Sequence, residues 1–158
     1  MKRLTTIIFA FFIVSISAQE EAFKKFYKVN KDKSTFSINL STSMAGSFLD
    51  DDDEERFSTL IKKSSNFKLM VFNNEDDTVS NNFKKFRRKN KLKILTRVKD
   101  DGGKAEFFFV EKNEYITEII IRANSDNEQL VLFCLKTEIT KDELAAIMSS
   151  SDLNISSE

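Results

Sequence analysis

The chain of 158 residues contains no histidine, no proline and no tryptophan, and it has a single cysteine. Histidine is the residue that most often acts as a general base near neutral pH and that most often binds zinc or copper. Its absence excludes Ser-His-Asp and Cys-His catalytic systems, histidine-bound zinc and haem with a histidine axial ligand within one chain. Carboxylate pairs and Ser-Lys arrangements stay open, but spacing selects none of them among so many acids and lysines. The sequence therefore predicts no catalytic residue, no metal ligand and no cofactor.

The single cysteine, Cys134, excludes a disulfide within the chain. It lies in the apolar run Leu130 to Leu135, which favours a small buried hydrophobic side chain over a disulfide between two copies or a reactive thiol. Phenylalanine, by contrast, occurs 16 times. The core is therefore expected to be rich in phenylalanine, and the turns, without proline, are expected to depend on Gly, Asn and Asp.

No charge of one sign dominates, because 25 basic residues balance 25 acidic ones. This balance indicates neither nucleic acid nor an anionic membrane as a partner. The acidic run Asp50 to Glu55 could bind calcium, but it lacks the alternating spacing and the glycine of an EF-hand, so a solvated helix start is favoured. The basic cluster Lys84 to Lys93 could bind phosphate or an anionic glycan. Because it interleaves with Phe83 and Phe86 at core spacing, a solvated helix end is favoured there too.

Residues 1–18 have the pattern of a Sec-type signal peptide. Lys2 and Arg3 precede an uninterrupted apolar run from Ile7 to Val14, and the small residue Ala18 precedes Gln19. The run is too short to cross about 30 Å of hydrocarbon as a helix, and no cysteine stands near the expected cleavage point for lipid attachment. We therefore expect an exported product, periplasmic or secreted, that is soluble after cleavage and has no transmembrane segment.

Hydrophobic periodicity predicts a succession of helices and strands. The first half is expected to form a helix over residues 20–30, a strand over 36–43, a helix over 50–63, a strand over 67–72 and a helix that follows Asn73 to Asp77. The second half is expected to form four strands, Lys91 to Lys99, Lys104 to Glu111, Tyr115 to Ala123 and Gln129 to Thr137. Asp100 to Gly103 has the composition of a hairpin turn, and Thr140 to Glu143 is a capping box that begins a last helix.

These elements predict an α+β fold in a single domain, residues 19–148, followed by a disordered serine-rich tail over residues 149–158. The four consecutive strands are expected to form a C-terminal antiparallel meander. The helical connections in the first half allow parallel pairings. The sheet is therefore predicted to be mixed but mainly antiparallel, and to be packed by about four short helices.

The meander contains strands that are apolar on both faces, whereas a half-exposed sheet should alternate apolar and polar side chains. Either helices cover both faces, or one face is left for a partner, a second copy or an apolar ligand. Short helices are expected to cover one face well and the other poorly. The residues predicted to form this apolar interaction surface are Phe108, Val110, Ile120, Val131 and Phe133.

With its elements in this order, the chain resembles a family of exported bacterial proteins that carry domain of unknown function 4252 (DUF4252). The likeness rests on the early helix Phe23 to Tyr27, the strands Phe36 to Ser43 and Phe67 to Phe72, the hairpin Val98 to Lys104, the strands Phe107 to Lys112, Tyr115 to Ile121 and Leu130 to Lys136, and the closing segment Ile139 to Leu144. The resemblance implies an envelope or secreted protein without an assigned activity or catalytic residues to carry over. Unlike the lipoprotein members of the family, this chain lacks a lipobox cysteine.

The sequence thus favours a non-catalytic binding or interaction module of the cell envelope. Its expected partner is an unknown envelope protein, an apolar ligand or a second copy of the chain. Two alternatives stay open. The resemblance implies a component of envelope-stress signalling, because family members are encoded near sigma-factor regulators. A carboxylate-dependent hydrolase would instead require a concave pocket in which two acids converge with perturbed titration.

Overall fold

The computed structural model describes residues 21–41, 44, 60, 62–73, 77–100, 103–125 and 129–150. In this part of the chain the fold is α+β, as predicted, with three α-helices and one sheet of six strands. The helices are α2 (Ala22–Asn30), α5 (Thr78–Lys89) and α6 (Lys141–Ser150), and a 3-10 turn, Lys31–Lys33, follows α2. The strands are β1 (Phe36–Ser41), β2 (Ser64–Asn73), β3 (Lys93–Asp100), β4 (Gly103–Lys112), β5 (Tyr115–Ser125) and β6 (Gln129–Ile139).

The sheet has the strand order β1-β2-β6-β5-β4-β3, and every neighbouring pair is antiparallel. The prediction of a mixed sheet is therefore wrong for the described strands. Helix α5 connects β2 to β3 at the opposite edge of the sheet, and the chain then returns through β4, β5 and β6 until β6 pairs with β2. Strands β2 and β3 consequently point in the same direction, but three other strands separate them. A helical connection was expected to join parallel neighbours, and here it joins strands that never pair.

Strands β3 to β6 lie side by side in chain order, and their bounds differ by up to two residues from those predicted. Strands β1 and β2 extend the sheet beyond β6. The helix predicted over residues 50–63 lies almost entirely outside the described residues, which contain three α-helices instead of about four. The predicted signal peptide and residues 151–158 of the predicted tail also lie outside them, whereas Ser149 and Ser150 belong to α6.

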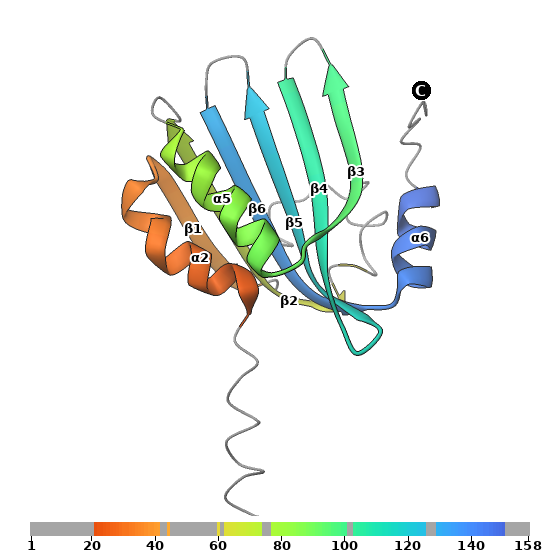
Figure 1. Ribbon diagram of the computed structural model, residues 1–158. Coiled ribbons are helices and arrows are strands. Elements are labelled where there is room, and N and C mark those ends of the chain that lie inside the picture. Colours follow the sequence, from red (N-terminus) through yellow and green to blue (C-terminus); the bar gives the residue numbers. More distant parts are fainter. Residues whose placement is uncertain are drawn as a thin grey trace, which may run out of the picture.

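Helices α2 and α5 cover one face of the sheet, which we call the inner face (Figure 1). Four phenylalanines at helical spacing, Phe23 and Phe26 from α2 and Phe83 and Phe86 from α5, form the contact, with ring centroids 5.1 to 6.0 Å apart. Beneath them lie fully buried strand side chains, namely Met70, Phe72, Phe108, Ile120, Leu130 and Leu132. Each such side chain contributes about 2 kcal/mol by leaving water, so this layer holds the helices on the sheet.

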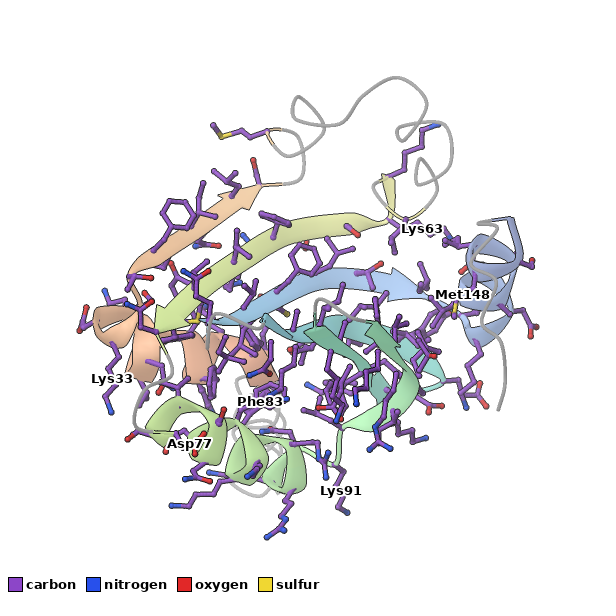
Figure 2. The ribbon with its side chains drawn as sticks, turned by 90° about the horizontal axis from the view of Figure 1, so that it is seen from above. Lys33, Lys63, Asp77, Phe83, Lys91 and Met148 are labelled. Atoms are coloured by element: carbon purple, nitrogen blue, oxygen red, sulfur yellow. The ribbon has the colours of Figure 1, made fainter. Side chains whose placement is uncertain are left out.

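Helix α6 lies on the opposite, outer face and covers a second apolar cluster. Leu144 and Ile147 of α6 pack there with Ile116 and Ile119 of β5 and with residues at the end of β6. Figure 2, seen from above, shows α2 and α5 together on one side of the sheet and α6 at one end of it. Among the described helices, α6 alone lies on the outer face, and its 10 residues cover one end of it.

The start of α6 and the turn between β4 and β5 both follow from local sequence. Thr140 Oγ1 accepts a hydrogen bond from the backbone N–H of Glu143 at 3.2 Å, and Glu143 Oε2 accepts one from the N–H of Thr140 at 2.8 Å. This reciprocal pair confirms the capping box at the start of α6. Asn113 and Glu114, between β4 and β5, have φ values of 50° and 70°, as a two-residue type I′ hairpin requires.

The capping box predicts the effect of one substitution. Thr140→Ala removes the hydroxyl that satisfies the N–H of Glu143, so the free energy of unfolding should fall by about 1 kcal/mol. Urea denaturation followed by circular dichroism measures this change. Ser37→Ala, which removes an exposed hydroxyl from β1, is the control and should change stability by less than about 0.5 kcal/mol. Equal stability of Thr140→Ala and the parent protein would contradict the role of the box.

Candidate functional site

The five residues predicted to form an interaction surface lie on two different faces of the sheet. Phe108 and Ile120 are fully buried and Val110 is almost so, all in the core between the sheet and the helices α2 and α5. The prediction is therefore wrong for these three residues, because a side chain covered by the protein's own helices presents no surface. Val131 and Phe133 point to the outer face and are half-buried.

The strand register places Val131 and Phe133 among apolar neighbours. Val131 lies between Val71 of β2 and Ala123 of β5, and Phe133 lies between Leu69 and Ile121 in the same two strands. Phe133 also meets Phe67 edge-on, with ring centroids 4.7 Å apart. The rows continue outward to β1 on one side and to β4 and β3 on the other.

These rows form an uncharged apolar surface that crosses all six strands. Its members alternate along each strand with the side chains of the inner core and are half-buried or exposed. We call this set the outer apolar face: Phe36, Ile38, Leu40, Phe67, Leu69, Val71, Val98, Ala105, Phe107, Ile121, Ala123, Val131 and Phe133. The sequence contained the signal that separates the two faces, because residues of one face share a parity along the strand. The predicted set combined three residues of the inner face, Phe108, Val110 and Ile120, with two residues of the outer face, Val131 and Phe133.

A second feature is a polar cavity of about 290 Å³ beside the N-terminus of α2. Its lining includes the carboxylates of Glu21, Glu118 and Glu138 and the ammonium groups of Lys112 and Lys136. None of these residues was singled out from the sequence. Glu118 interrupts the apolar stretch Ile116 to Ile121. An acid within a mostly apolar strand was the feature of the sequence that could have identified this residue.

Glu118 is 2% exposed and holds the start of α2 against β5. Its Oε1 accepts the N–H of Ala22 at 2.6 Å, and its Oε2 accepts the N–H of Phe23 at 2.9 Å. The first N–H groups of a helix have no partner within the helix, and the helix dipole favours a negative charge at that end. Burial nevertheless raises the pKa of Glu118, and it outweighs the two backbone hydrogen bonds that lower it.

Glu21, the residue before α2, is held by two lysines. Its Oε2 lies 3.2 Å from Nζ of Lys68, and its Oε1 lies 2.9 Å from Nζ of Lys136. Burial alone would raise the pKa of Glu21, but the hydrogen bonds and charges of Lys136 and Lys68 outweigh it, so the pKa is lowered. Lys68 is itself buried, and this pairing compensates its charge.

Two acids with pKa values moved in opposite directions are a pattern seen in general acid–base sites. Here, however, both oxygens of Glu118 accept backbone N–H groups, and both oxygens of Glu21 accept lysines. The four contacts fix α2 on the sheet and occupy the carboxylate oxygens that a hydrolase would offer to its substrate. The arrangement therefore supports a structural role for this acid pair.

The thiol of Cys134 lies beside the same carboxylate, with Sγ 3.9 Å from Oε2 of Glu118. Cys134 is buried and free, which confirms the prediction of a small buried side chain. Burial raises the pKa of the thiol well above its ordinary value, and the neighbouring carboxylate raises it further. A thiol in this state is a poor nucleophile.

The described residues contain neither a candidate metal site nor a candidate membrane span. Within that part of the chain, no group of three or more Cys, Asp and Glu residues could hold a metal ion. Likewise, no helix there is both long and apolar enough to cross a bilayer. The acidic run Asp50 to Glu55, weighed above as a calcium site, lies outside the described residues.

Glu118 predicts a distinctive pH dependence. Since its pKa in the folded protein is raised above the ordinary 4.5, the native state holds this proton more tightly than the unfolded state. The contribution of Glu118 to stability is then fully present below pH 4.5 and declines as pH rises through the folded pKa. Glu118→Gln should be less stable by about 1–3 kcal/mol, because its amide cannot accept both N–H groups. We call the difference in free energy of unfolding between the parent protein and Glu118→Gln the stability gap, and it should be smaller at pH 7 than at pH 4.

Urea denaturation of both proteins across this pH range measures the gap. The shifts of the other carboxylates are common to both proteins and cancel in the difference. Glu114→Gln, on the exposed turn between β4 and β5, is the control and should follow the parent curve. A gap that widens as the pH rises would contradict the raised pKa of Glu118.

Comparison with known proteins gives a family and no characterised relative. No curated protein and no solved structure matches the chain. The model of one family, described as a domain of unknown function (DUF4252), matches residues 24–147. That match runs from the first turn of α2 to the last turn of α6 and so spans the whole described sheet. The resemblance expected from the sequence is confirmed, and the chain belongs to the DUF4252 family.

Proposed function

We propose that the protein is an exported, non-catalytic binding module whose outer apolar face associates with the same face of a second copy. The observation that carries this proposal is the continuous uncharged surface across six strands, which α6 covers at one end. Soluble monomers rarely expose apolar patches larger than a few hundred Å², and larger ones mark interaction sites. Two rows of side chains across six strands make a face of roughly 400 Å² in projection, which is the size of the largest apolar patch on a typical monomer, and such patches are often functional.

A second copy suits this surface in chemistry and in shape. The face carries no charge in the rows around Val131 and Phe133, so two copies bring no like charges together. The whole chain has equal numbers of acids and bases, which keeps long-range repulsion between copies small. Two sheets packed face to face interdigitate their side chains at about 10 Å, as in a β-sandwich.

The edge strand β1 belongs to the same surface. Its sequence, Phe36 to Ser41, contains no charged residue, and Phe36 is 51% exposed. Edge strands of monomeric proteins commonly carry charges that prevent association. The opposite edge, β3, does carry them, at Lys93, Arg97 and Lys99. The outer apolar face therefore extends to its β1 edge without a charged residue.

The signal-peptide pattern of residues 1–18 supports export. In an export-competent bacterial host, the product recovered outside the cytoplasm should begin at Gln19, as measured by intact mass and N-terminal sequencing. Ile8→Arg places a charge in the apolar run and should retain the precursor inside the cell. Recovery of the parent protein in the cytoplasm with residues 1–18 intact would contradict export.

Sedimentation velocity tests the association. The chain beginning at Gln19 should sediment as a dimer at micromolar concentration, and Phe36→Glu and Val131→Lys should each shift it to the monomer. Val29→Glu is the matched control, because Val29 is 72% exposed on α2 and lies away from the outer apolar face. Circular dichroism establishes that each variant is folded. A parent protein that stays monomeric, or one that carries a copurified apolar ligand in place of the second copy, would overturn the proposal.

A further inference from the structure

The inner face carries a group of cations where α5 no longer covers the sheet. Figure 1 shows α2 and α5 in front of β1, β2, β6 and β5, with the ends of β4 and β3 near their connecting turn lying beyond the helices. On these strand ends the register brings Arg97 of β3, Glu106 of β4 and Arg122 of β5 into one row. The next row contains Lys99, Lys104 and Asn124.

A single buried carboxylate stands among these cations. Glu106 lies 3.0 Å from Nε of Arg97, 3.1 Å from Nη1 of Arg122 and 3.4 Å from Nζ of Lys104. Burial would raise the pKa of Glu106, but the charges and hydrogen bonds of Lys104, Arg122 and Arg97 outweigh it and lower the pKa. Glu106 is therefore a carboxylate anion, and it neutralises one of the three cations that touch it.

The second row combines two opposed lysines with a buried polar atom that has no partner among the described residues. Lys99 and Lys104 are directly opposite each other, and like charges in that position destabilise a sheet. Asn124, on the other side of Lys104, has a buried Oδ1 for which the structure shows no hydrogen-bond partner. A buried polar atom without a partner is typical of functional sites, where a ligand supplies the missing hydrogen bond.

Helix α5 adds two cations to the side of this area. Ser80, Lys84 and Arg87 share one stripe of the helix, at spacings of four and three residues. The stripe faces β4 and β5, since Oγ of Ser80 lies 3.3 Å from Nη2 of Arg122 and the guanidinium of Arg87 lies over the ring of Phe108 at 5.7 Å. We call the whole group the cationic shelf: Lys84, Arg87, Arg97, Lys99, Lys104 and Arg122.

The shelf differs from the basic cluster noted in the sequence. That cluster ran from Lys84 to Lys93, but the register places Lys93 on the outer face, where Glu111 pairs with it. The tertiary structure instead places the α5 stripe beside cations of β3, β4 and β5 that lie 10 to 38 positions after Arg87 and Lys84. A solvated helix end explains the charges of α5 alone and leaves the opposed lysines of the sheet unexplained.

We propose that the cationic shelf binds an anionic saccharide that carries carboxylate or phosphate groups and free hydroxyls. Cations on alternate residues of adjacent strands are spaced by about 5–7 Å, which suits successive charged sugars along a chain. The unpartnered Oδ1 of Asn124, which lies beside Lys104, suits a sugar hydroxyl. Single-stranded nucleic acid would require aromatic side chains for stacking, and the shelf has none.

Isothermal titration with defined probes tests the proposal. A short oligogalacturonate should bind the chain beginning at Gln19 at about 50 mM salt and weaken as salt rises, and an uncharged maltooligosaccharide should not bind. Lys99→Gln/Lys104→Gln should weaken binding by about tenfold and flatten its salt dependence. The control Lys24→Gln/Lys33→Gln removes the same charge from exposed positions on and after α2, and it should bind as the parent does.

Stability distinguishes a binding role from a structural one. The double substitution removes both the repulsion between Lys99 and Lys104 and the ion pair of Lys104 with Glu106, and these effects oppose each other. The Lys99→Gln/Lys104→Gln protein should therefore unfold close to the temperature of the parent, while it loses affinity. If the control variant weakened saccharide binding as much, the loss of affinity would be explained by net charge alone, and the proposal would be overturned. Tighter binding of duplex DNA or of anionic phospholipid vesicles than of the saccharide would also overturn it. The shelf and the outer apolar face are on opposite sides of the sheet, so failure of dimer formation leaves this test unaffected.

Discussion

The structure depends on a sheet whose central strands are apolar on both faces. Strands β2, β4, β5 and β6 each place large side chains alternately on the inner and the outer face. Water is excluded from the inner face by α2 and α5, whose four phenylalanines interlock above it. The outer face receives only α6 among the described helices, at one end. The described helices thus cover the inner face more completely than the outer face. The proposed association follows from this difference, because removing an apolar surface of this extent from water is favourable.

Charged groups on the inner face fall into two situations. Beneath α2, the charges of Glu118, Glu21 and Lys68 are each satisfied by the helix N-terminus or by one another, and the result is attachment of the helix. Beyond α5, the single carboxylate of Glu106 pairs with Arg97, Lys104 and Arg122, and Lys99 lies directly opposite Lys104. In the first arrangement each charged group has a partner within the protein, so its role is structural. The second leaves positive charge and an amide oxygen available, which is why we assign binding to it.

Local sequence signals predicted the elements well. The capping box at Thr140 and Glu143, the helical spacing of Phe83 and Phe86, and the four strands of the second half all correspond to observed structure. These features depend on residues within a few positions of one another. Strand order could not be predicted in the same way, because the position of β3 at the far edge is decided by how β6 returns to pair with β2. The same limit explains why Phe108, Val110 and Ile120 were placed on a surface, since periodicity in one strand does not say which face a helix will cover.

The amino-acid sequence by itself determined the α+β class, the family, the positions of most helices and strands, and the exclusion of histidine chemistry and of an internal disulfide. Composition and short-range spacing suffice for these, because they concern which atoms exist and how neighbours along the chain interact. The tertiary structure decided which apolar face α2 and α5 cover, that Glu118 caps α2 from a strand 95 residues away, and that Arg97 of β3, Lys104 of β4 and Arg122 of β5 meet around Glu106. Such contacts join distant segments, and their energy depends on burial and register that arise only when the whole sheet has formed.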